Sequence, residues 1–295
     1  MLDQLAAAVG RHRNGLWSGT TAVPRLTVVA LDDLVNPLSL RYEPMVCFIA
    51  EGVKRTVTGE HSRLARRGDM FLNSLDLPVT AVFEEVPYRS VVLHLDGPAL
   101  ADLLLELDGE DPAVPVAGQV SATMSPELVD AVTRWVRLLD TPDDIRPLAA
   151  RVEAEILYRL LGSPLGPTLR QFAAAGSALT RVRAAADWIA AHFTEPITVE
   201  QVAAVAHMSP ATLHRHFKAT TGMSPLRFQK HLRLQEARRL LVAGDTTAAH
   251  TAEAVGYASA TQFTREYRRA YGLPPVRDAA RLRGRLTESR PRGTR

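Results

Sequence analysis

Cysteine is nearly absent: Cys47 is the single one among 295 residues, which excludes an intramolecular disulfide. Long apolar runs are absent as well, since none approaches the ~20 residues that a helix needs to cross a bilayer. Residues 1–5 are acidic and amphipathic, whereas a signal peptide begins with a basic segment followed by an apolar one. We therefore expect a cytoplasmic protein that does not contact a membrane.

The two parts of the chain carry net charges of opposite sign. Residues 1–177 contain 16 Lys/Arg and 23 Asp/Glu, a balance of −7. Residues 178–295 contain 19 Lys/Arg and 9 Asp/Glu, a balance of +10. An acidic front and a basic back indicate that the back meets a polyanion. Charge alone does not separate DNA from RNA, from an acidic protein or from an ordinary solvated surface.

The front half has the pattern of an antiparallel β-structure between residues 25 and 95. Runs rich in β-branched and aromatic residues alternate there with turn residues at spacings of roughly ten, which is typical of a sandwich or barrel. The runs are 26–29, 45–49, 55–58, 70–72, 79–83 and 90–95. Turns are expected at Asn36-Pro37, Glu51-Gly52, Thr58-Gly59, residues 67–69 and Val86-Pro87.

Helical spacing predicts a short helix within residues 1–20 and two helices over 125–140 and 144–161, with Pro142 and Pro147 as the breaks between them. Residues 162–167, Gly-Ser-Pro-Leu-Gly-Pro, indicate a helix stop and a linker. The fold class is α+β, an antiparallel β-barrel with flanking helices followed by an all-α domain. We place the two domains at 1–165 and 179–285, the linker at 166–178 and a basic tail at 286–295.

Residues 198–222 have the pattern of a helix-turn-helix. Thr198 with Gln201 forms a capping-box pattern, and Ser209 with a following proline starts a second helix. In a helix-turn-helix this second helix enters the major groove of DNA. Its outer face presents four residues at helical spacing: Ala211, His214, Arg215 and Lys218.

The same layout returns in residues 246–272. Gly256 suits a left-handed turn, and Ser259 caps the next helix. Aligning Ser209 with Ser259 places Arg215 on Arg265, an internal correspondence stronger than either motif alone. The outer face of the second helix carries Thr261, Thr264, Arg265 and Arg268. A long helix through residue 242 joins the two units and would fix the two recognition helices relative to each other.

These residues resemble the AraC/XylS family of transcriptional regulators over about one hundred positions. The motifs that carry the resemblance are residues 208–210 (MSP), 213–218 (LHRHFK), 221–225 (TGMSP), 233–241 (RLQEARRLL), 255–259 (VGYAS), 262–267 (QFTREY) and 272–275 (GLPP). Tyr42-Glu43-Pro44, Gly68-Asp69 and residues 77–80 (LPVT) are similar to the cupin-like N-terminal domain of one subgroup. The resemblance implies an effector-binding, dimerising front and a DNA-binding back.

Carried over by position, the family's base-reading residues are Ala211, His214 and Arg215 in the first unit and Ala260, Thr261 and Arg265 in the second. The two arginines can form bidentate contacts with guanine, whereas an alanine offers only apolar contact. The candidates for phosphate contact are Ser209, Lys218, Ser259 and Arg268. The alternative interpretation of every one of these residues is a solvated helix surface.

A metal centre is not expected. Enzymes with a cupin barrel bind their metal through a His-x-His pair, a nearby Glu and a later His, but the strand-rich region contains only His61 and His94. His214 and His216 have the right spacing, yet positions i and i+2 of a helix point apart. Cys47 lies in an apolar run, where a buried inert thiol is the default and an effector-sensing thiol the sharper hypothesis.

The sequence thus predicts a regulator, without catalytic residues or cofactors, that binds double-stranded promoter DNA. A small-molecule effector, a second copy of the chain and RNA polymerase are the other expected partners. The helices over 125–140 and 144–161 are candidates for the dimer contact, with packing against the barrel as the alternative. Two rival functions stay open, a metal-dependent cupin enzyme fused to a DNA-binding domain and an RNA-binding or architectural protein.

Overall fold

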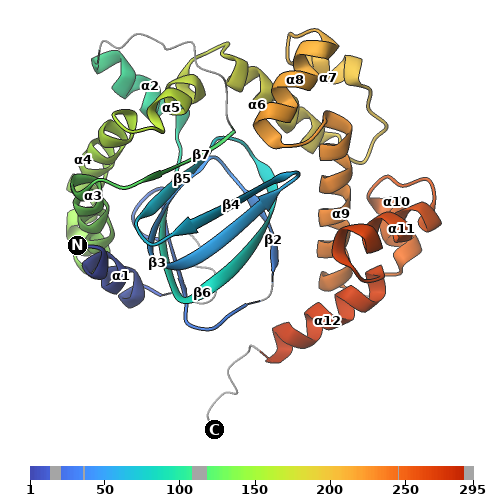
Figure 1. Ribbon diagram of the computed structural model, residues 1–295, viewed down its shortest axis with the longest axis horizontal. Coiled ribbons are helices and arrows are strands. Elements are labelled where there is room, and N and C mark those ends of the chain that lie inside the picture. The colour runs from blue at the N-terminus through green and yellow to red at the C-terminus, as the bar shows by residue number, and fades with distance from the viewer. Residues whose placement is uncertain (14–20, 36, 108–117, 245, 289–295) are drawn as a thin grey trace.

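Seven strands form one antiparallel sheet in the computed structural model, which describes residues 1–13, 21–35, 37–107, 118–244 and 246–288 (Figure 1). The strand order is β1-β6-β3-β5-β7, with β2 added to β6 and β4 to β3. The strands are β1 (Leu26–Leu31), β2 (Leu38–Tyr42), β3 (Met45–Thr58), β4 (His61–Arg66), β5 (Asp69–Asn73), β6 (Leu77–His94) and β7 (Gln119–Thr123). The antiparallel β-structure expected for the front half is confirmed, but the pairings of the described strands do not close it into a complete barrel.

Two expected turns lie inside long strands, and these predictions were wrong. The runs 45–49 and 55–58 belong to one strand, β3, whose pairing with β6 shifts register between Ile49 and Lys54. Gly52 takes φ +80° there, and a Cβ at Gly52 would lie 2.7 Å from two carbonyl oxygens of β6. The expected turn at Val86-Pro87 is likewise internal to β6. The turn residues therefore produce bulges and bends, which let β3 and β6 each pair with several neighbours.

Helices cover the sheet on two sides. Figure 1 shows α1 (Leu2–Arg11), α3 (Pro126–Arg137) and α4 (Pro142–Leu161) on one side and α9 (Pro225–Ala243) on the other. The turn η1 (Leu138–Asp140) joins α3 to α4, and α2 (Gly97–Glu106) lies near α5 (Gly166–Ala173). The expected break at Pro147 is absent because this proline is inside α4, whereas Pro142 occupies its first turn.

The segment expected to be a linker contains a helix. Helix α5 starts at Gly166, and its Leu169 and Phe172 are buried against the rest of the front half. The helix has only 8 residues, which is too short to show a helical period in the sequence, and the prolines at 164 and 167 favour an irregular chain. Pro167 instead occupies the first turn of α5, where its missing N–H costs nothing.

The back half is entirely helical among the residues described. It comprises α6 (Ala178–Ala191), α7 (Val199–Val205), α8 (Pro210–Thr221), α9, α10 (Ala248–Ala254), α11 (Ala260–Tyr271) and α12 (Pro275–Glu288). Helix α12 extends through the start of the expected basic tail, and residues 289–295 of that tail lie outside the described part of the chain. None of the helices described is long and apolar enough to cross a membrane.

The apolar core divides within α9. Leu213, Phe217 and Phe228 of the first helix-turn-helix region belong to the same buried cluster as the sheet. Phe263 and Tyr267 of the second region belong to a separate cluster with Leu234 and other residues of α9. The first unit is therefore continuous with the front half, and the second unit has a small core of its own.

Candidate nucleic-acid interface

The first unit has the caps that its sequence predicts. The Thr198 hydroxyl accepts a hydrogen bond from the backbone nitrogen of Gln201. The side-chain oxygen of Gln201 accepts one from the backbone nitrogen of Thr198, so the capping box is complete. Ser209 caps α8 through a hydrogen bond from the Thr212 nitrogen (3.3 Å). His207 takes φ +50° in the turn, and Gly222 ends α8 in the left-handed region. These local contacts set the direction of α8.

The second unit repeats this construction with one extra residue in its turn. The nitrogen of Met208 donates to the carbonyl of Ala203, and that of Tyr257 donates to Ala252 in the same manner (3.0 and 2.9 Å). Ser209 follows Met208 directly, whereas Ala258 separates Tyr257 from its cap, Ser259. The two units therefore begin their second helix with the same serine cap, but the turn before that cap is one residue longer in the second unit.

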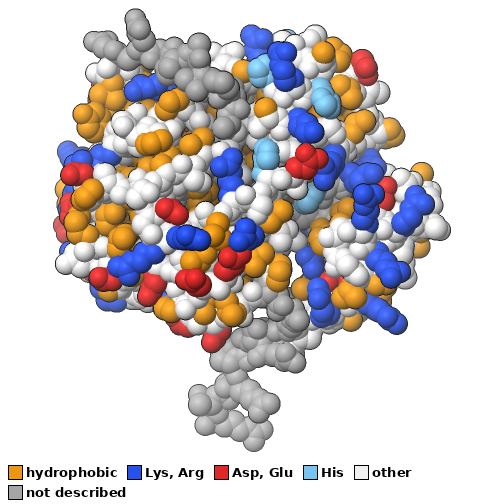
Figure 2. Space-filling model, in the orientation of Figure 1, with side chains coloured by type: hydrophobic (Ala, Val, Ile, Leu, Met, Phe, Trp, Pro, Cys, Tyr) orange, Lys and Arg blue, Asp and Glu red, His pale blue; other side chains and the backbone are white. Residues whose placement is uncertain are grey.

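All ten residues expected to contact DNA are exposed on α8, α11 or their caps. They are Ser209, Ala211, His214, Arg215, Lys218, Ser259, Ala260, Thr261, Arg265 and Arg268. Within the described part of the chain, the guanidinium groups of Arg215 and Arg265 have neither a hydrogen-bond nor an ion-pair partner. Figure 2 shows Lys and Arg side chains gathered over α8 and over the helices that follow it. Two unpaired arginines on exposed helix faces are suited to a polyanion.

Among the charged side chains of the ten, Lys218 has a partner. The ammonium of Lys218 lies 3.6 Å from a carboxylate oxygen of Glu60, which belongs to the turn between β3 and β4. The same carboxylate accepts a hydrogen bond from Arg227 of α9 (2.7 Å). Arg227 was not among the residues singled out from sequence, because its partner is 167 positions away.

A polar network joins α9 to the segment that follows α6 and to the turn of the second unit, and the sequence did not reveal it. On α9, the guanidinium of Arg233 donates to the carbonyls of Phe193 (2.5 Å), Glu195 (2.8 Å) and Gly256 (2.8 Å). Gln229 donates to the first two of these carbonyls as well. The chain end of α6 and the turn of the second unit are therefore bound to the same face of α9, which holds both recognition helices on one frame.

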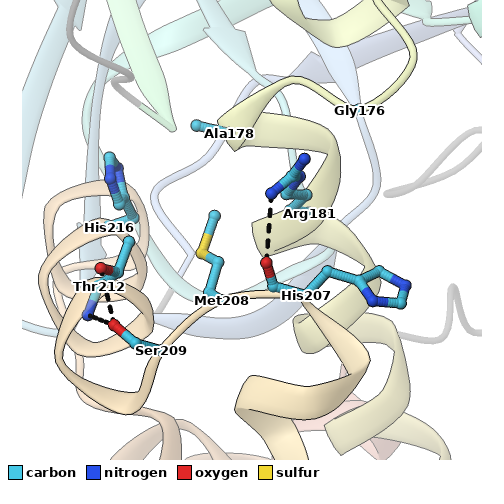
Figure 3. Close-up of a pocket in the computed structure, with 8 residues that line it drawn as sticks. All are labelled: Gly176, Ala178, Arg181, His207, Met208, Ser209, Thr212 and His216. Carbon is cyan, nitrogen blue, oxygen red and sulfur yellow. Dashed lines mark hydrogen bonds between the residues drawn. The ribbon is translucent and has the colours of Figure 1, made fainter.

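An open pocket of about 470 Å³ lies beside the start of α8 (Figure 3). Arg181 of α6 extends along it and donates to the carbonyl of His207 (3.2 Å), while the His207 ring points away from Arg181. The lining residues are Gly176, Ala178, Arg181, His207, Met208, Ser209, Thr212 and His216. The pocket thus places an additional exposed cation next to Ser209.

The interior of the sheet holds an unusual lysine. Lys54 is 6% exposed, and its ammonium lies 4.9–5.9 Å from the ring centres of Tyr42, Phe71, Phe83 and Tyr88. The sulfur of Cys47 is 4.0 Å from the same ammonium, and no carboxylate pairs with it among the described residues. Cys47 itself is fully buried. The default interpretation of Cys47, a buried thiol, agrees with this position, whereas no local pattern indicates the aromatic cage around Lys54.

A second open pocket, of about 390 Å³, lies between the sheet and the back half. Its wall includes Glu43, Asp76 and His94 from the sheet and Arg183 and Asp187 from α6. Burial, helped by the charge of Asp76, raises the pKa of the Asp187 carboxyl. Within the part of the chain that the structure describes, no three His, Cys, Asp or Glu side chains are grouped as a metal site would require.

Comparisons with known proteins agree with this geometry. Residues 22–168 match the family model of the AraC-type transcriptional regulator N-terminus, and residues 202–281 match a helix-turn-helix domain. The chain is 35% identical over 88 residues to YobQ of Bacillus subtilis, an uncharacterized HTH-type transcriptional regulator, covering 30% of this chain and 36% of YobQ. It is 26% identical over 230 residues to the transcriptional activator RhaS of Shigella dysenteriae, covering 77% and 78%.

The fold has a counterpart among solved structures. Unsaturated fatty acid bound ToxT from Vibrio cholerae aligns with a TM-score of 0.53 and 11% identity, covering 91% of this chain and 96% of ToxT. In this chain a β-sheet domain precedes two helix-turn-helix units. The model that residues 22–168 match is that of AraC-type transcriptional regulators, and the helix-turn-helix match and the relatives agree with it: the chain belongs to the AraC family. The chain spans only 36% of the length of YobQ.

Proposed function

We propose that this chain regulates transcription by binding specific promoter sequences through α8 and α11. The unpaired guanidinium groups of Arg215 and Arg265 carry the proposal, because each is exposed at the same position of a capped recognition helix. Each would read a guanine in the major groove. His214, Thr261, Ala211 and Ala260 would line the same base edges. Nothing in the described residues supplies the metal ligands that the rival function, a cupin enzyme, requires.

Phosphate contacts would set the register of the two helices on DNA. Ser209, Ser259 and Arg268 lie at the edges of the proposed base-reading faces. Arg181 joins them, since its hydrogen bond to His207 holds the guanidinium at the turn before α8. These contacts would strengthen binding without selecting a sequence.

The front half would bind a small-molecule effector. The pocket of about 390 Å³ supports this part of the proposal, because both the sheet and α6 line it and its volume suits a small ligand. A ligand that contacts both halves changes their arrangement by as much as its affinity differs between arrangements. The buried pair of Cys47 and Lys54 is the second candidate for sensing, within the sheet itself.

A homodimer would form through α4. The apolar stripe of α3, including Trp135, is buried within the chain, so it is not free for a partner. On α4, Leu148 and Tyr158 are 40% and 56% exposed. A contact with RNA polymerase at the promoter would complete the regulatory role.

The test is fluorescence anisotropy with duplexes selected from a random pool, at fixed near-physiological salt. Arg215→Ala and Arg265→Ala are each expected to weaken binding by about 1–3 kcal/mol and to relax the base preference at one position. Arg66→Ala is the matched control, since Arg66 is exposed at the end of β4 and its side chain is unpaired among the residues described. A selection that enriches no sequence, or equal loss in all three variants, would refute sequence-specific recognition.

A further inference from the structure

A single carboxylate connects the sheet to two cations of the DNA-binding half. Glu60 is at the tip between β3 and β4, and its two oxygens lie 2.7 Å from Arg227 and 3.6 Å from Lys218. Lys218 belongs to the last turns of α8 and Arg227 to the first turn of α9. All three side chains are about half exposed, so the cluster lies at the protein surface.

Close backbone contact holds the tip in this position. A Cβ at Gly59 would lie 2.6–2.7 Å from atoms of Met223 and Gly222, and one at Gly222 would lie 2.9 Å from the carbonyl oxygen of Thr58. A Cβ at Gly118, next to β7, would lie 2.1 Å from the carbonyl oxygen of Thr220. Glycines on both sides therefore allow the tip to approach the end of α8 closely, and this approach delivers Glu60 to the two cations.

The chemistry of the pair suits another anion. Lys218 shares the outward face of α8 with Ala211, His214 and Arg215, the proposed base-reading residues. A guanidinium and an ammonium at one edge of such a face are typical of contacts with backbone phosphate. A carboxylate has the same sign of charge and the same hydrogen-bond acceptors as a phosphate group. Arg227, and then Lys218, lower the pKa of the Glu60 carboxyl, which therefore stays charged near neutral pH.

We infer that Lys218 and Arg227 form a site for a DNA backbone phosphate, which Glu60 occupies in this structure. The sheet domain and DNA then compete for the same two cations. Binding of duplex DNA requires the tip to release them, and release costs little because exposed ion pairs are individually weak. The inference rests on the proposed function only in taking DNA as the polyanion, since phosphate contacts do not depend on sequence.

The test uses the full-length chain and a duplex of random sequence, with anisotropy measured over a series of NaCl concentrations. Glu60→Gln is expected to tighten binding two- to ten-fold at low salt. Glu84→Gln is the matched control: it removes the same charge from the sheet domain, but Glu84 pairs with Arg55 within the sheet. Less than a two-fold change is expected for Glu84→Gln. Equal effects of the two substitutions would overturn the inference.

Substitutions of Lys218 and Arg227 provide the second part of the experiment. Lys218→Gln and Arg227→Gln are each expected to weaken binding and to reduce the slope of log affinity against log salt by about one. In the chain carrying both substitutions, Glu60→Gln should have no further effect. A full effect of Glu60→Gln in that background would show that Glu60 acts without the two cations, contrary to the inference.

The two proposals fail in distinguishable ways. If Glu60→Gln and Glu84→Gln change the affinity for random duplex equally, the competition is overturned and sequence-specific regulation is left intact. Binding to random duplex with no sequence enriched by selection overturns sequence-specific regulation and leaves the competition intact. A chain that binds no duplex in any variant overturns both.

Discussion

The guanidinium of Arg233 donates a hydrogen bond to the carbonyl of Gly256, which binds the connecting helix α9 directly to the turn of the second unit (2.8 Å). Arg233 also donates to two carbonyls that follow α6. One side chain thus satisfies acceptors from segments on either side of α9 in the sequence. Its removal is expected to loosen both units at once.

Arg233→Ala should lower the free energy of unfolding by about 2–4 kcal/mol, because three carbonyls lose a charged donor. Arg239→Ala, on the exposed side of the same helix and paired with Glu236, should change it by no more than about 0.5 kcal/mol. Urea denaturation of the full chain measures both. Similar costs for the two substitutions would mean that Arg233 does not hold the units together.

Gly256 allows a paired substitution with Gly272. Both glycines take φ near +80°, but a Cβ at Gly256 would lie 1.9 Å from the carbonyl oxygen of Thr194, whereas nothing lies within 4 Å of one at Gly272. Gly272→Ala should cost about 1 kcal/mol from its backbone conformation alone. Gly256→Ala should cost about 3 kcal/mol or more, since the backbone must also move.

Thermal or urea denaturation separates the two costs. If Gly256→Ala were no worse than Gly272→Ala, the close approach of the second unit to Thr194 would be disproved.

Asp278 is a fully buried carboxylate between α9, α11 and α12. It accepts hydrogen bonds from Arg238, Arg281 and the hydroxyl of Tyr267. Asp278→Asn should destabilise the chain by about 3–5 kcal/mol, because it leaves the partly buried Arg238 without its counter-charge. Tyr267→Phe removes one hydrogen bond and should cost about 1 kcal/mol. Calorimetry measures the stability of both variants, and an Asp278→Asn variant as stable as the native chain would contradict the prediction.

His231 should make stability depend on mild acid. Burial, and secondarily the charge of Arg227, lowers the pKa of this imidazole in the folded chain below its ordinary value of 6.5. As the pH falls below 6.5, the unfolded chain takes up a proton more readily than the folded one, so unfolding is favoured. The stabilisation is complete above pH 6.5 and is lost as the pH falls through the lowered pKa.

The measurement is the free energy of unfolding between pH 7.5 and 5.5, in the native sequence and in His231→Gln. The native chain should lose stability over this interval, and the variant should lose less. Carboxylates with lowered pKa, such as Glu155, start from an ordinary value of 4.5 and act at lower pH. A loss of the same size in both proteins would assign the effect to another group.

Local signals in the sequence predicted much of the back half. Ser209, Ser259 and the pair of Thr198 with Gln201 act within three residues of themselves, so their caps could be inferred without a fold. The exposure of Arg215 and Arg265 followed from helical spacing once the caps were known. Their contact with DNA remains a prediction, as do the domain boundaries.

What the sequence did not predict depends on distant partners. Gly52 and Pro87 have the local character of turns, but pairing between β3 and β6 keeps both inside strands. Lys54 has no local pattern that would predict its burial, and it is enclosed by four rings from three strands. The ion pair of Glu60 with Arg227 joins residues too far apart for any spacing rule.

The division of the apolar core within α9 connects the two helix-turn-helix units to the sheet in unequal ways. Phe217 and Phe228 connect the first unit to the sheet, so a change in the sheet reaches α8 through continuous packing. The second unit, with Phe263 and Tyr267, has a separate apolar cluster and meets the sheet through polar contacts, among them the hydrogen bond from Arg238 of α9 to the Ser39 hydroxyl. Under the proposed function, recognition by α8 should therefore respond more strongly to the ligand state than recognition by α11.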